Sequence, residues 1–211
     1  MTIIEMHDYV DLLLDKANSP WFTSDEKDKF LNLAQDEFVE NRYDKFELDE
    51  RTRKELLPLV RLETGSSVSV IDINLIPNFR YTLNLIGEFN KTCGTGTMFN
   101  RIHPLQLDDE GSNENDPFNK SSDSNPCYIE CNNGAANEII IKSDNVPLTY
   151  KLKYLASPRD VLRDLVDPLN NIDSELPEFM HEDLVYIAVR KMMGNTEQQL
   201  NYQIQQNEEQ K

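Results

Sequence analysis

Several residue types that carry chemistry or staple small folds are scarce in this 211-residue chain. It contains three histidines, three cysteines, one tryptophan and seven glycines. Cys93, Cys127 and Cys131 are an odd number, which argues against a disulfide framework, so free thiols are expected. A chain of this length buries a core without disulfides or metals, as one domain or as one domain with a large insertion.

Basic residues and long apolar runs are also scarce. Lys and Arg number 21 against 38 Asp and Glu, which gives a formal net charge of −17. A protein that grips phosphates over a broad surface needs the opposite sign, whereas this charge would repel DNA that passes without sticking. The first 15 residues contain no Lys or Arg, and no run of 18 apolar residues exists, so neither a secretory signal nor a membrane span is expected.

Four amphipathic helix patterns are present, three before residue 61 and one after residue 177. In each, apolar residues recur every three or four positions and so share one helix face. The spaced residues are Met6, Val10, Leu13 and Ala17; Phe30, Ala34 and Phe38 with Leu31 and Leu33 alongside; Thr52, Leu56 and Leu59 or Val60; and Met180, Leu184, Ile187, Ala188 and Met192.

Capping residues mark the ends of these helices. Thr23 and Glu26 have the spacing of a capping box, and Asp49 can cap the third helix. Pro58 is expected to kink or end that helix, because its ring removes a donor and clashes one turn back. Ser157-Pro158 resembles an N-cap followed by proline at the first helical position, which predicts a short helical turn through Leu165.

Between residues 67 and 155 the apolar period changes to two, which predicts strands. A polar stretch at 108–126 is longer than a compact domain normally carries without purpose. The expected strands cover 68–75, 79–85, 97–107, 127–131, 138–142 and 148–154, with turns at Pro77-Asn78 and Asn132-Asn133-Gly134.

The predicted fold class is α+β. A helical bundle built from the N-terminal helices and a C-terminal helix carries an inserted antiparallel region that resembles a β-sandwich or β-barrel. The expected parts are residues 1–64, the β-rich insertion 65–156, and residues 157–211, which complete the bundle and end in a mobile tail.

Motifs for catalysis or metal binding are incomplete. His181-Glu182 begins like a zinc-protease helix, but Val185 stands where the second histidine is needed. Cys127 and Cys131 are spaced too widely for a metal knuckle, and no second close pair exists. The remaining patterns fail as a dinucleotide loop, an EF-hand or a nucleophile elbow, so no enzyme, metal or cofactor is expected.

Three stretches, taken in order, resemble a known family. They are Ser19–Thr23 with Ala34–Phe38; Arg101–Gln106 followed by Asp116–Lys120 and Pro126–Ile129; and Leu176–Glu178 through His181-Glu182 to Ala188–Arg190. Together they resemble the ring-forming head-to-tail connector and tail-tube adaptor proteins of short-tailed bacteriophages, most closely those of crAss-like phages.

The resemblance implies a structural virion protein of the neck or tail, assembled in the host cytoplasm. Its partners would be further copies of itself in a ring of twelve, the portal protein and neighbouring ring or tail proteins. Genomic DNA would pass through the lumen during ejection without specific binding, and no membrane would be involved. Twelve copies at −17 each give roughly −200 for such a ring, a sign that repels phosphates.

In such a ring the loop 108–126 would be an arm that clasps a neighbour. The candidate contacts between subunits are Asp116, Pro117, Phe118, Asn119 and Lys120. A lone aromatic residue in a polar loop requires a pocket, which a partner can supply. The alternative is that Phe118 folds back onto its own sheet, and the sequence leaves both readings open.

The sequence leaves two other functions as alternatives. A phage tail accessory protein would bind a receptor or carbohydrate through the β region, although Trp21 lies beside a helix cap and not in that region. A hydrolase with a degenerate motif is the weaker alternative.

Overall fold

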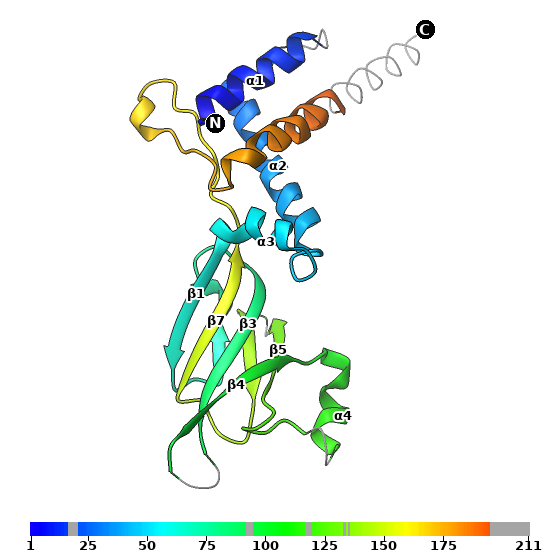
Figure 1. The fold of residues 1–211 in the computed structure, drawn as a ribbon, viewed down its shortest axis with the longest axis vertical. Coiled ribbons are helices and arrows are strands. Elements are labelled where there is room, and N and C mark those ends of the chain that lie inside the picture. Colours follow the sequence, from blue (N-terminus) through cyan, green and yellow to red (C-terminus); the bar gives the residue numbers. More distant parts are fainter. Residues whose placement is uncertain (17–20, 92–94, 117–119, 133, 135, 195–211) are drawn as a thin grey trace. The chain divides into compact units, whose positions relative to one another are not determined.

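A computed structural model describes residues 1–16, 21–91, 95–116, 120–132, 134 and 136–194. The chain forms two compact units, one of residues 1–59 with 157–211 and the other of residues 60–156. The described residues form five α-helices and a seven-stranded sheet (Figure 1), so the predicted α+β class is confirmed. We call the two parts the helical unit and the β unit.

The helical unit takes its helices from both parts of the sequence. Its elements are α1 (Ile3–Lys16), α2 (Ser24–Tyr43), α3 (Glu50–Leu56), the 3₁₀ turns η1 (Leu57–Leu59), η4 (Pro168–Asn170) and η5 (Glu178–Met180), and a C-terminal helix whose described part covers 181–194. The Thr23–Glu26 capping box and the Asp49 cap are both present, as predicted. Pro58 ends α3 as an α-helix, and the chain continues as η1.

The helix faces largely follow the predicted spacing. The buried apolar side chains include Met6, Val10, Ala34, Phe38, Leu56, Leu59, Met180, Leu184, Ala188 and Met192. Leu14 is buried where Leu13 was expected, and Leu33 is 51% exposed, while Ala17 lies outside the described residues. The polar residues Lys27, Asp28 and Gln35 are buried on α2, which the pattern did not predict.

The β unit contains one curled sheet in the order β1-β7-β3-β4-β5-β6-β2, a half-barrel. Its strands are β1 (Val60–Ser66), β2 (Val70–Asp72), β3 (Phe79–Asn90), β4 (Thr97–Pro104), β5 (Cys127–Asn132), β6 (Asn137–Lys142) and β7 (Thr149–Ala156). The turn η2 (Ile73–Leu75) interrupts the single strand expected at 68–75. Strand β1 was missed, because Val60 was assigned to the preceding helix and residues up to 64 to the helical part.

The predicted antiparallel region resembling a β-sandwich or β-barrel is a mixed half-barrel, so the prediction is wrong in one strand pairing. Strands β4 and β5 run parallel, with His103 opposite Cys127, and the other described pairs are antiparallel. A parallel pair needs a crossover of about a dozen residues or more, whereas a hairpin needs about two. The long polar stretch after β4 is this crossover, so its length has a role within the fold.

The inner face of the curled sheet carries the core of the β unit. Leu85, Phe89, Ile102 and Leu152 are buried there with Tyr150 and Tyr154. The alternation predicted for β7 is confirmed, since its even-numbered side chains from Tyr150 to Tyr154 are buried and Lys151 and Lys153 are exposed. In β3 the register shifts twice near Tyr81 and Asn84, which breaks the alternation expected there.

Candidate interaction surfaces

The predicted contact loop has defined structure in its described part. The turn η3 (Leu107–Asp109) and the short helix α4 (Glu110–Asn115) occupy half of it. Of the candidate contacts, Asp116 and Lys120 are described, and the Lys120 N–H donates to the Asp116 carbonyl at 3.0 Å. Pro117, Phe118 and Asn119 lie outside the described residues.

Polar contacts tie this loop to its own sheet. Lys142 on β6 lies 2.7 Å from the Glu110 carboxylate, and this hydrogen bond raises the pKa of Lys142. The buried Asp123 carboxylate accepts the backbone N–H of Asn145 at 2.8 Å and its side-chain amide at 2.6 Å, while Asn100 donates to the Asp123 carbonyl. Residues 107–116 and 120–126 are therefore part of the β unit.

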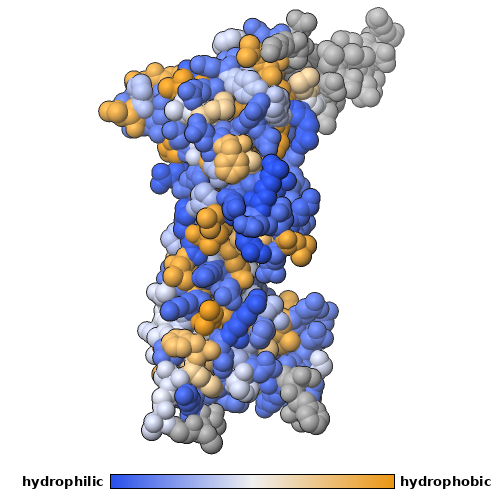
Figure 2. Space-filling view, viewed as in Figure 1, coloured by the Kyte–Doolittle hydropathy of each residue, from blue (hydrophilic) through white to orange (hydrophobic). Residues whose placement is uncertain are grey.

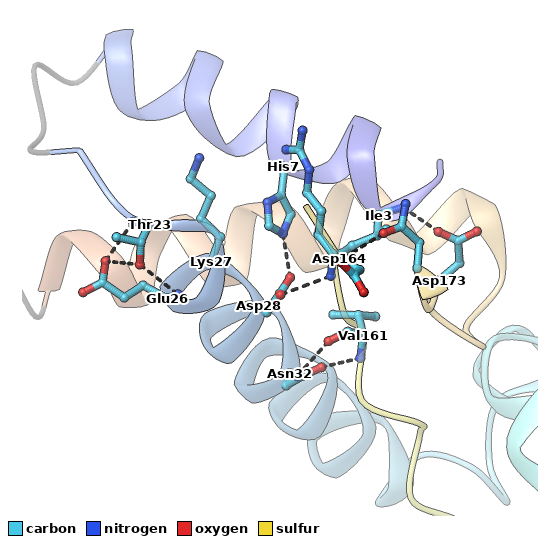
Figure 3. Close-up of polar contacts among 12 residues, drawn as sticks. Ile3, His7, Thr23, Glu26, Lys27, Asp28, Asn32, Val161, Asp164 and Asp173 are labelled. Atoms are coloured by element: carbon cyan, nitrogen blue, oxygen red, sulfur yellow. Dashed lines mark hydrogen bonds and ion pairs between the residues drawn. The ribbon is translucent and has the colours of Figure 1, made fainter. Parts of the chain in front are cut away.

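In the helical unit, α2 holds the return segment (residues 157–177) by a ladder of polar side chains (Figure 3). Asp28, Asn32 and Gln35 are spaced four and three residues apart, so they lie on one helix face. Asp28 accepts the Arg163 N–H at 3.1 Å. The Asn32 amide accepts the Val161 N–H at 2.7 Å and donates to the Val161 carbonyl at 3.2 Å, and Gln35 donates to the Arg159 carbonyl at 3.2 Å.

This polar ladder satisfies alternate backbone groups of residues 159–163 much as a neighbouring strand would. It also explains why the helical turn predicted from Ser157 to Leu165 does not form, since those backbone groups bind α2 instead. The far end of the return segment is held as well. Asp173 accepts the Ile3 N–H of α1 at 2.6 Å, and Ser174 donates to the Gln35 side chain at 2.6 Å.

Between these anchors, residues 163–171 form a closed turn that we call the aliphatic loop. Leu162 and Ile172 close it through two backbone hydrogen bonds of 3.1 and 2.9 Å. Inside it, the Asp164 carboxylate accepts the N–H groups of Val166 and Asp167 and the Asn170 amide, at 2.8, 3.0 and 3.1 Å. The loop is therefore ordered by its own hydrogen bonds.

The outer side chains of the aliphatic loop are apolar and exposed. Leu165 is 71% exposed, Val166 93% and Leu169 92%. Figure 2 shows apolar surface at the edge where Figure 1 places this loop, drawn in yellow. Single exposed aliphatic residues are ordinary, but a group of three on one ordered loop is a candidate contact surface.

The Asp164 carboxylate makes the order of the aliphatic loop depend on pH. The N–H groups of Asp167 and Val166, with the Asn170 amide, hold the pKa of Asp164 below its ordinary value of 3.8. A lowered folded pKa means that the stabilisation is complete above the unfolded pKa and is lost as the pH falls through the folded value. We therefore expect the amide proton resonances of Val166 and Asp167 to shift below pH 3.8 in NMR spectra.

An Asp164→Asn variant supplies the comparison for this pH effect. It keeps one acceptor oxygen but cannot ionise, so its Val166 and Asp167 amides should show no transition at acid pH. If the unsubstituted chain also shows no transition at these two amides, Asp164 does not organise the loop.

A second surface feature of the helical unit is a groove between α2 and the C-terminal helix. It has a volume of about 320 Å³, and we call it the helix groove. The lining residues are Glu37, Phe38, Asn41, Arg42, Asp183, Tyr186, Ile187 and Arg190. Glu37 binds both Arg190 and Lys191, and the Lys191 hydrogen bond is the main cause of the lowered pKa of Glu37.

Groups suited to catalysis or metal binding have structural partners or lie apart. His7 is buried against Asp28 at 2.7 Å, and His181 is buried between the Met1 and Leu176 carbonyls. His103 is exposed on β4. Among the residues that the structure describes, no group of three or more His, Cys, Asp or Glu is placed to hold a metal ion. The helices in the same ranges are also too short or too polar to cross a bilayer.

Comparisons of the sequence with models of known families and with curated proteins find no match. Sequence reasoning placed its candidate contacts at Asp116–Lys120 and did not select Leu165, Val166 and Leu169. The criterion used for Phe118, an apolar side chain in a polar segment, also selects these residues. The sequence predicts a helical turn through Leu165 and a linker from residue 167, and neither of these predicts an ordered apolar loop.

Proposed function

We propose that this chain is a non-catalytic structural subunit of an oligomeric ring. The ring would belong to the head-to-tail connector or tail tube of a short-tailed bacteriophage, where it would join the portal and neck to the tail. In this proposal the helices from both chain ends form the bundle through which subunits meet, and the location is the virion. Support comes from the family resemblance of the sequence and from a surface feature of the helical unit.

The main structural support for this proposal is the exposed apolar surface of the aliphatic loop. Burying one aliphatic side chain of this size stabilises a contact by about 1.5–3 kcal/mol, and Leu165, Val166 and Leu169 are all available. Because Asp164 and the Leu162–Ile172 bridge already order the loop, binding would lose little conformational entropy. An ordered apolar loop is better suited to a protein partner than to a small polar ligand.

The acidic composition fits the proposed position around a DNA channel. With 38 acidic against 21 basic residues, a ring lumen of the same sign would repel phosphates and let the genome slide. The repulsion is screened beyond about 8 Å at physiological salt, so it would act close to the lumen wall.

Native mass spectrometry over a concentration series tests the proposal. We expect masses at multiples of 24.5 kDa that increase with concentration and converge on one closed oligomer, visible as rings by electron microscopy. A chain that stays monomeric up to roughly 1 mM, where contacts of about 4 kcal/mol are detected, would rule out a self-assembling ring subunit. Monomers that retain a carbohydrate ligand would favour the alternative function, a tail accessory protein that binds a receptor or carbohydrate through the β region.

A further inference from the structure

We propose that the aliphatic loop of one copy docks into the helix groove of the next copy, in a head-to-tail contact. This inference rests on the proposed ring function and names the two surfaces that would build it. Both surfaces belong to the helical unit, so the contact would repeat from copy to copy without any other partner.

The size and lining of the helix groove suit the loop. Its volume of about 320 Å³ equals roughly ten waters at ~30 Å³ each, enough for one or two aliphatic side chains. Phe38 and Ile187 supply an apolar floor, since Phe38 is buried and Ile187 is half-buried, and Tyr186 adds a ring that is 48% exposed. Val166 and Leu169, each more than nine-tenths exposed, are the side chains that would enter.

The helix groove is less acidic than the chain as a whole. Arg42 and Arg190 line it together with two carboxylates, and Lys191 lies beside Glu37. Because Arg42 also pairs with Glu55 at 3.0 Å, three cations balance three carboxylates there, in a chain where acids outnumber bases 38 to 21. The aliphatic loop carries Asp164 and Asp167 against Arg163, so its slight negative charge would meet a nearly neutral rim without strong repulsion. Such rim charges mainly fix orientation and association rate.

The placement of the surfaces favours a ring over a two-fold dimer. In Figure 1 the aliphatic loop projects to the left of the helical unit, whereas the second half of α2, which lines the groove, runs to the right. A two-fold axis pairs each surface patch with itself, but a loop on one side and a groove on the other generate a heterologous contact. Repetition of that contact closes a ring or extends a filament.

Two single variants with native mass spectrometry test this contact. Val166→Asp damages the loop and leaves the groove intact, and Ile187→Asp does the reverse. Each is expected to weaken self-association at least thirtyfold, the effect of losing a contact of about 2 kcal/mol. Mixed in equal amounts, they should form a dimer with one copy of each variant, because the loop of Ile187→Asp fits the groove of Val166→Asp. That dimer should add no third copy.

Three comparisons make the test decisive. Leu48→Asp changes a leucine that is 86% exposed elsewhere in the helical unit and should assemble like the unsubstituted chain. Because Ile187 is half-buried, Arg190→Glu provides a groove variant at a side chain that is 68% exposed, with the same expected loss. A photocrosslinking amino acid placed at Val166 should form its crosslink within residues 37–42 or 183–190 of another copy.

The outcomes separate this inference from the proposed function. If the unsubstituted chain assembles but the groove variants assemble equally well, or the crosslink forms elsewhere, the groove is not the docking surface and the ring proposal survives. If the mixture forms no dimer although each variant is folded, the loop does not pair with the groove and the inference is wrong. If the unsubstituted chain never assembles, both proposals fail together.

Discussion

Replacing Leu165, Val166 and Leu169 together by serine is expected to leave the chain folded and to abolish its assembly. These side chains are 71–93% exposed, so their removal costs the isolated fold little. With two of them buried in the helix groove, they would contribute about 3–6 kcal/mol before ordering costs, at 1.5–3 kcal/mol for each buried side chain. We expect the dissociation constant to increase by at least about a hundredfold, measured by sedimentation velocity, with an unchanged circular dichroism melting curve.

A matched variant controls for general loss of apolar surface. Leu48 and Leu57 are 86% and 63% exposed in the same unit but lie outside the aliphatic loop and the helix groove. Their replacement by serine should leave assembly unchanged. If the triple variant assembles at the same concentration as the unsubstituted chain, the aliphatic loop is not a contact surface. The proposed function would then lose its main structural support.

Local features of the fold were predictable from the sequence. The capping box at Thr23 and Glu26 and the apolar spacing of α1, α2 and the C-terminal helix depend on residues within a few positions of one another. The alternation of Tyr150, Leu152 and Tyr154 likewise reports a strand with one buried face. Such short-range patterns directly express helix and strand periodicity.

Features that depend on distant partners were not predictable. The parallel pairing of β4 with β5 follows from the crossover between them, which by sequence was a long polar loop. Strand β1 lies at the edge of the sheet and pairs with β7, about ninety residues further along the chain. Local sequence does not show this partner, and the prediction therefore assigned residues up to 64 to the helical part.

The organisation of the return segment was hidden for the same reason. Asp28, Asn32 and Gln35 are polar residues on a helix, which by sequence belong to a solvated face. Their partners Arg163, Val161 and Arg159 are 135, 129 and 124 positions away. Without that pairing nothing distinguishes the exposed Leu165, Val166 and Leu169 from residues of a helical turn and a linker, so the candidate contact surface was missed.

Replacing Asp28 by alanine is expected to destabilise the helical unit by about 3 kcal/mol or more. Asp28 is 5% exposed and accepts two hydrogen bonds, from His7 Nε2 at 2.7 Å and from the Arg163 N–H at 3.1 Å. Its loss leaves both buried donors without that acceptor, and each unsatisfied group costs about 1–3 kcal/mol. Urea unfolding followed by helical circular dichroism, with Trp21 fluorescence as a second probe in the same unit, measures the change.

Two further variants of α2 complete this test. The first is a control for Asp28→Ala, and the second links the stability of the helical unit to the aliphatic loop. Asp25→Ala removes an exposed carboxylate from the first turn of α2 and should cost about 0.3–1 kcal/mol through the helix dipole alone.

Asn32→Ala removes the middle residue of the polar ladder, whose side chain binds both the N–H and the carbonyl of Val161. Because the ladder anchors one end of the aliphatic loop, Asn32→Ala should speed amide hydrogen exchange at residues 161–167 and weaken assembly, although Asn32 is not in the proposed contact. Faster exchange with unchanged assembly would mean that loop order does not contribute to binding.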